Sequence, residues 1–84
     1  MQESNSDAKL TALRGLAFLQ ERNNNPRYLG ASMNVKRLAA DREYVMPPDY
    51  HFPLEEAGLR KNGNIPSEIL DAIAETLGGR HPTV

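Results

Sequence analysis

The segment from Met46 to Pro53 limits the fold of this chain more than any other part of it. It reads Met-Pro-Pro-Asp-Tyr-His-Phe-Pro, with three prolines in eight residues. Proline lacks a backbone N–H and biases the residue before it toward extended geometry, so a continuous helix cannot pass through this segment. We therefore expect an irregular strap rich in proline and aromatic residues, which separates the middle helix from the C-terminal part of the chain.

Apolar residues at helical spacing predict two helices before the strap. Leucines recur on one face of residues 7–23, which we expect to form the first helix with Ser6 as its N-cap. Residues 1–5 are polar and are expected to be a disordered N-terminus. Pro26 should end this first unit. A second helix is expected over 32–43, where apolar residues again lie three and four positions apart.

A short helix and a turn are expected after the strap. Pro53 suits the first position of a helix over 53–59, because that position needs no backbone donor. Glu55 and Glu56 would then lie near the positive end of the helix dipole. Residues 61–64 read Lys-Asn-Gly-Asn and have the composition of a turn.

The last helix has the clearest boundaries in the sequence. Pro66 precedes an apolar stripe and two glycines follow it, which predicts a helix over 66–77 and a tail over 80–84. A chain of 84 residues has room for one core. We therefore expect residues 1–84 to form a single all-α domain of three to four helices.

The residues that are absent exclude several classes of protein. The chain has no cysteine, so it has no disulfide framework, no thiolate nucleophile and no cysteine-based metal site. Its N-terminus is polar where a secretory signal would be basic and then apolar, and no apolar run is long enough to span a membrane. We expect a cytoplasmic protein.

Few residues offer chemistry for catalysis. The chain has two histidines, His51 and His81, and no phosphate-binding glycine loop. Asp49, His51 and Glu55 are close in sequence, but Pro53 should break the helical geometry that would bring them together around a metal ion. We therefore expect a protein that is not an enzyme, with no metal, no cofactor and no small-molecule substrate.

The aromatic residues are concentrated in and around the strap. Tyr44, Tyr50 and Phe52 fall within nine positions, interleaved with prolines. Aromatic side chains on a proline-stiffened segment suit a docking surface, because little ordering is needed on binding. The predicted partner-binding residues are Tyr44, Met46, Tyr50, Phe52 and Leu54. The alternative is that these side chains complete a small core.

We accordingly expect a small regulatory or adaptor protein of bacterial or phage origin that binds another protein, or a second copy of itself as a homodimer. The charge distribution is compatible with self-association. Residues 1–42 carry seven Lys and Arg against four Asp and Glu, whereas residues 43–84 carry three against seven. The simpler interpretation of this difference in charge between the two halves is that the charged residues lie on solvent-exposed helix faces.

Two segments support an alternative function in DNA binding. Residues 28–31 are expected to form a turn or a short helical piece, and residues 29–38 resemble the turn and recognition helix of helix-turn-helix proteins. Residues 54–63 look like the end of a winged-helix recognition helix followed by a wing. The DNA-contacting residues of such a transcriptional regulator would be Asn34, Lys36, Arg37 and Arg42. A third interpretation is an accessory subunit of a larger complex.

Overall fold

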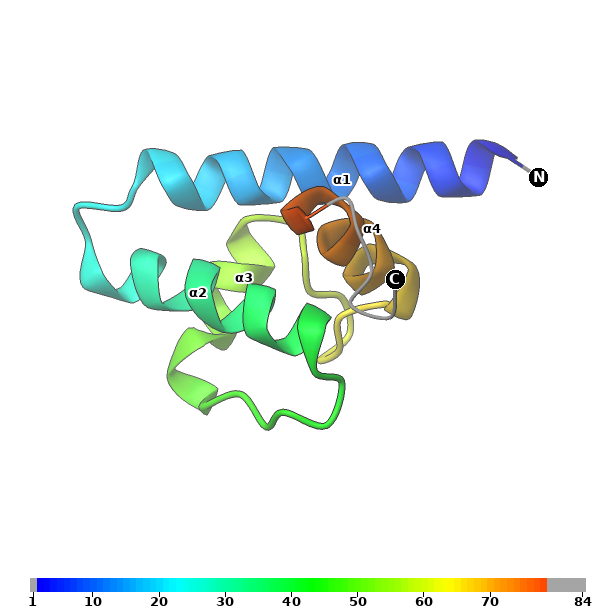
Figure 1. The fold of residues 1–84 in the computed structure, drawn as a ribbon. Coiled ribbons are helices and arrows are strands. Elements are labelled where there is room, and N and C mark those ends of the chain that lie inside the picture. The colour runs from blue at the N-terminus through cyan, green and yellow to red at the C-terminus, as the bar shows by residue number, and fades with distance from the viewer. Residues whose placement is uncertain (1, 79–84) are drawn as a thin grey trace.

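Four α-helices form the structure, a computed structural model that describes residues 2–78 and the side chains of residues 7–77. They are α1 (Gln2–Glu21), α2 (Pro26–Ala40), α3 (His51–Glu56) and α4 (Ser67–Gly78), and a 3-10 turn η1 (Pro48–Tyr50) precedes α3. No strand occurs in this part of the chain, which confirms the all-α prediction. α1 lies along one side of the molecule, and the other helices pack against one face of it (Figure 1).

The ends of the described region differ from the sequence-based expectation. α1 already includes Gln2, whereas the helix was expected to start near residue 7 with Ser6 as its cap. Residues 2–5 therefore belong to a helix, since none of them is a proline or glycine that would stop it. The tail expected over 80–84 lies outside the described residues.

The second helix starts earlier than predicted. α2 is continuous through residues 28–31, so this stretch is helical, which was one of the two forms expected for it, and no separate turn occurs there. The helix ends at Ala40 rather than at residue 43. Pro26 was expected only to end the first helical unit, but it is also the first residue of α2. Asn25 caps this helix, because the Asn25 side chain accepts a hydrogen bond of 3.0 Å from the Arg27 N–H. The chain reverses at this point, so α1 and α2 lie side by side in opposite directions (Figure 1).

The strap is partly helical, contrary to the irregular segment that was expected. Pro48 opens η1, and Pro53 is the third residue of α3 rather than the first of a helix over 53–59. These positions tolerate proline because the first turn of a helix has no internal acceptor for its N–H groups. Glu55 and Glu56 consequently lie in the last turn of α3, not near its positive end as predicted.

Backbone hydrogen bonds close α3 and the segment after it. Gly58 has a φ of 82°, and the Leu59 N–H donates to the Leu54 carbonyl at 3.0 Å, which is the geometry of a Schellman cap. The predicted turn over 61–64 is confirmed. Asn62 and Gly63 both have positive φ, and Lys61 and Asn64 exchange two backbone hydrogen bonds across an isolated bridge.

One hydrophobic cluster holds the helices together. The fully buried Leu19, Leu54, Leu59 and Ile73 come from four different parts of the chain. Leu59 fills the space above Gly15, where an added Cβ would lie 2.3 Å from Leu59 Cδ2. Glycine at this position therefore allows the segment after α3 to pack closely on α1. α4 begins one residue later than predicted and packs against both α1 and α2.

Candidate protein-interaction surface

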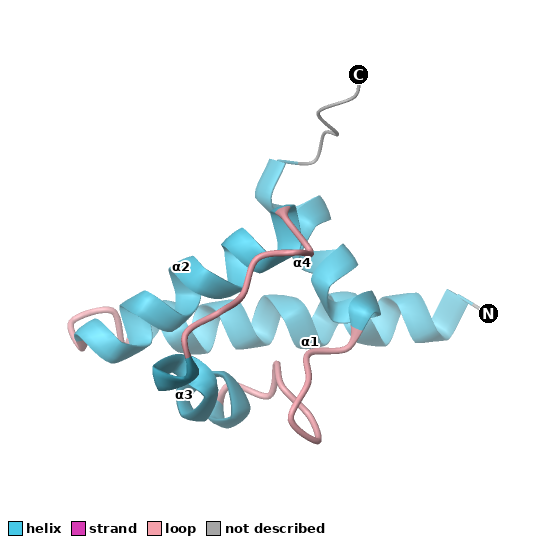
Figure 2. Cartoon of the chain, turned by 90° about the horizontal axis from the view of Figure 1, so that it is seen from below, coloured by secondary structure: helices cyan, strands magenta, loops and turns pink. Residues whose placement is uncertain are grey.

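The segment that follows α2 crosses back over this helix on the side away from α1 (Figure 2). Its first anchor is Tyr44, whose hydroxyl donates a hydrogen bond to Asn34 Oδ1. The Asn34 amide in turn donates to the Gly30 carbonyl at 2.7 Å. The Arg37 guanidinium carbon lies 5.1 Å from the centre of the Tyr44 ring, within the range of a cation–π contact. The residues that lead into the strap are thereby fixed to α2.

The second anchor of the strap is Tyr50, at the end of η1. Its ring lies directly on Gly30, where an added Cβ would be 2.4 Å from Tyr50 Cε1. Tyr50 and Met46 are half-buried and pack against the core cluster. The absence of a side chain at Gly30 is thus what lets η1 approach α2.

The far end of α3 is held by two polar contacts. Arg60 forms an ion pair of 2.7 Å with Glu55, and the Tyr28 hydroxyl donates a hydrogen bond to Glu56. That hydrogen bond to a carboxylate raises the pKa of Tyr28 above its usual value of 10.0. Tyr28 also lies beside Phe18, with the ring centres 6.3 Å apart, so the contact ties α3 to α2 and to the end of α1.

The predicted partner-binding residues divide by exposure. Leu54 has no exposed surface and belongs to the core. Tyr44, Met46 and Tyr50 are half-buried and hold the strap in place. Phe52 is 58 % exposed and points away from the buried side of α3. Most of the aromatic strap therefore completes the core, and Phe52 is the member of the set that offers a large free surface.

Two further exposed apolar residues lie on α2 and on the segment that joins α2 to η1, and sequence reasoning did not identify either. Val45 is 85 % exposed and Met33 is 61 % exposed. Alternation in an extended segment could have found Val45, since its neighbours Tyr44 and Met46 face inward. Met33 follows Gly30 by one turn of α2 and therefore borders the strap, but this is visible only once α2 is known to begin at Pro26. We define Met33, Val45 and Phe52 as the strap surface.

The four residues predicted to contact DNA do not all lie on one face, although Asn34 and Arg37 both contact Tyr44. Asn34 is engaged by Tyr44 and Gly30, and Arg42 forms an ion pair of 2.7 Å with Asp71. Arg37 lies over the Tyr44 ring, and Lys36 is on a different side of α2 from Arg37 because they are adjacent in a helix. The helix-turn-helix geometry is also absent, since α1 and α2 lie side by side in opposite directions rather than crossing (Figure 1).

The possible metal ligands of the strap are arranged differently from the prediction. Pro53 does not interrupt α3, so His51 and Glu55 do lie one turn apart on the same helix. Glu55 is nevertheless paired with Arg60. Within residues 2–78, no three His, Asp or Glu side chains are grouped as metal ligands would be.

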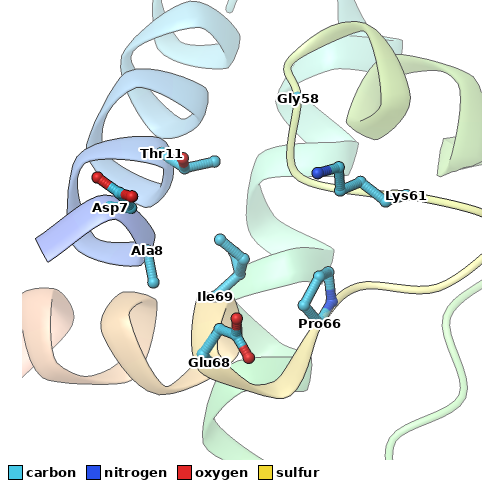
Figure 3. Close-up of a pocket in the computed structure, with 8 residues that line it drawn as sticks. All are labelled: Asp7, Ala8, Thr11, Gly58, Lys61, Pro66, Glu68 and Ile69. Atoms are coloured by element: carbon cyan, nitrogen blue, oxygen red, sulfur yellow. The ribbon is translucent and has the colours of Figure 1, made fainter. Parts of the chain in front are cut away.

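A hollow of about 400 Å³ lies between the start of α1, the 61–64 turn and the start of α4 (Figure 3). Asp7, Lys61 and Glu68 line it, but their charged ends do not converge on one point. Ligand sites usually combine an apolar lining with a few convergent polar groups. The hollow lacks that arrangement and is a weaker candidate site than the strap surface.

No protein-family model, curated protein or solved structure matches this chain. Among the helices that the structure describes, none is long and apolar enough to cross a membrane.

Proposed function

We propose that this protein is a small adaptor without catalytic activity of its own, which binds another protein through the strap surface. The observation that carries the proposal is the arrangement of Met33, Val45 and Phe52. They are the three most exposed large apolar side chains in the described region, and all lie on α2 or on the segment packed against it. Large apolar residues that are exposed on neighbouring elements are candidates for a binding surface.

Rigidity of the strap favours binding. Tyr44 and Tyr50 fix it to α2 at two points, and Met46 fixes it to the core. A segment that is already ordered loses little conformational entropy when a partner docks on it. The half-buried aromatic residues thus contribute to binding by holding Val45 and Phe52 in place.

The exposed part of Phe52 sets the scale of its contribution. A phenylalanine covers roughly 150–250 Å², so its 58 % exposure leaves on the order of 100 Å² for a partner. Burying that area is worth about 2 kcal/mol, which corresponds to about a thirtyfold change in affinity.

The charges around the strap surface are mixed. α2 carries Arg27, Lys36 and Arg37 and no acidic residue. The segment that follows α2 carries three exposed acidic residues, Asp41, Glu43 and Asp49. We therefore propose a partner segment that is recognised mainly through its apolar residues, with flanking charges of both signs.

Affinity capture tests the proposal when it is combined with matched variants. The tagged chain is used to capture proteins from a cell lysate, next to Phe52→Ser, Met33→Ser and the control Leu77→Ser, whose leucine is an exposed residue on α4. We expect a captured protein that binds the purified wild-type chain directly and is lost with the first two variants but kept with the control. Circular dichroism verifies that each variant is folded. A binding protein that is captured equally by all four chains would contradict the proposal.

A further inference from the structure

The outer face of α1 is a second apolar surface, on the opposite side of the molecule from the strap. α1 buries Ala8, Ala12 and Leu19 against the other helices. On its opposite face Leu10 is 48 % exposed and Leu13 is 45 % exposed. Figure 1 shows that no other described element covers this face, and Figure 2, seen from the strap side, shows α1 behind the rest of the chain.

The spacing of the apolar residues on this face is that of a short coiled-coil interface between two helices, which we call the seam. Leu10, Leu13 and the exposed Ala17 lie at i, i+3 and i+7, which are the a, d and a positions of a heptad repeat. A second helix with the same spacing would pack against them. Asp7 and Arg14 then lie along one edge of the seam, and both side chains are exposed.

The charges at the edges of the seam select one arrangement of two copies. A parallel pair would place Lys9 of each copy, which pairs with Glu75 of its own chain at 3.5 Å, beside Arg14 of the other, and would bring no opposite charges together across the seam. An antiparallel pair with Leu10 opposite the second copy's Leu13 instead brings Asp7 of each copy close to Arg14 of the other. If one helix is shifted along the other to the next antiparallel alignment, Arg14 lies opposite Arg14 of the second copy, or Asp7 lies opposite Asp7. Charge complementarity therefore occurs in a single register.

We infer that α1 pairs with α1 of a second copy in antiparallel orientation, with Leu10 of each chain against Leu13 of the other and Asp7 beside Arg14 across the seam. The inference extends the proposed function, because the dimer would carry one strap surface on the outer side of each subunit and so bind two partner segments. The seam covers little more than two helical turns, so the dimer is expected to be weak and to dissociate on dilution.

Sedimentation at a series of concentrations tests whether the dimer forms. The mass of the wild-type chain should rise from 9.4 kDa toward twice that value as the concentration increases from about 10 µM to about 1 mM. Leu13→Glu should stay monomeric, and the control Met33→Glu, which adds the same charge outside α1, should still dimerise. A wild-type chain that is monomeric throughout, or a Leu13→Glu variant that associates like the wild type, would overturn the inference.

Charge exchange and cross-linking test the register. Asp7→Arg and Arg14→Asp should each weaken the dimer about tenfold, because both pairs of residues 7 and 14 across the seam become repulsive. The double variant Asp7→Arg/Arg14→Asp keeps the net charge of the wild type and should restore association. The chain has no cysteine, so a mixture of Leu10→Cys and Leu13→Cys should form mixed disulfides under oxidation. Disulfides between identical variants in preference to mixed ones would indicate a parallel pair and overturn the register.

The outcome is separable from that of the proposed function. Monomeric Leu13→Glu keeps Met33, Val45 and Phe52, so it should still capture the strap-surface partner. If the strap surface has no partner, the dimer of α1 is still measured by sedimentation alone.

Discussion

The contact between Tyr50 and Gly30 gives the most informative test of how the strap is attached. In Gly30→Ala the added Cβ would lie 2.4 Å from Tyr50 Cε1 and 2.7 Å from Tyr50 Cζ. Carbon atoms normally approach to about 3.5–4.0 Å, so the ring and α2 must separate. Such overpacking costs about 1–3 kcal/mol. Alanine is about 1 kcal/mol better than glycine in a helix interior, so a net loss of about 1 kcal/mol is expected.

The same substitution should have the opposite effect when the ring is removed. In a Tyr50→Ala background the methyl group at residue 30 has space, and only the gain in helix propensity of about 1 kcal/mol remains. Gly30→Ala should therefore stabilise that background. The difference between the two effects gives a coupling energy of about 2 kcal/mol between residues 30 and 50, a value typical of residues in contact.

Urea unfolding followed by circular dichroism measures this cycle. Four chains are needed: the wild type, the two single variants and the double variant, with the free energy of unfolding obtained by linear extrapolation. The decisive result is the sign of the Gly30→Ala effect in each background. If Gly30→Ala stabilises the wild type as much as it stabilises Tyr50→Ala, then the Tyr50 ring does not lie on Gly30 and the described attachment of the strap is wrong.

Three further results are expected. Gly15→Ala should destabilise the fold by about 1–2 kcal/mol in urea unfolding, because the new methyl meets the fully buried Leu59 at 2.3 Å and the overpacking exceeds the gain in helix propensity; a stabilised variant would contradict this packing. The hydrogen bond to Glu56 raises the pKa of Tyr28 in the folded state. Its contribution to the stability of the fold is therefore complete below 10.0, the pKa of Tyr28 in the unfolded chain, and is lost as the pH rises through the higher pKa of the folded state. Tyr28→Phe should therefore lose less stability than the wild type between about pH 9 and 12, and an unchanged alkaline slope would refute the hydrogen bond. In gel-shift assays at two salt concentrations, duplex DNA should show no binding that weakens steeply with salt, whereas such binding would favour a DNA-binding regulator.

The sequence predicts the helices better than their boundaries. The apolar spacing around Val35 identifies a helix correctly, and the glycines and proline around 66–77 nearly locate the last one. Two of the boundary errors come from prolines. Pro26 and Pro53 were expected to end or start a helix, but each is compatible with the first turn of a helix that its neighbours cap or extend.

The site was harder to predict because its residues depend on contacts that are distant in sequence. The aromatic content of the strap was visible, but not that Tyr50 would find its place on Gly30, twenty residues earlier in the sequence. Gly30 was interpreted as a turn residue. The sequence alone does not distinguish a glycine that makes room for an aromatic ring from a glycine that closes a turn. The division of the strap into anchors and an exposed Phe52 follows from that contact together with the hydrogen bond from Tyr44 to Asn34.

Mapping the footprint of the captured partner tests the proposed adaptor function most directly. The purified, ¹⁵N-labelled chain is titrated with that partner, and the amide signals that change are assigned to residues. We predict that changes concentrate at Met33, Val45 and Phe52 and their neighbours in α2 and α3, while the exposed face of α4 around Asp71 is unaffected. Changes concentrated on α4 or around the 61–64 turn, with the strap surface unaffected, would contradict the proposal.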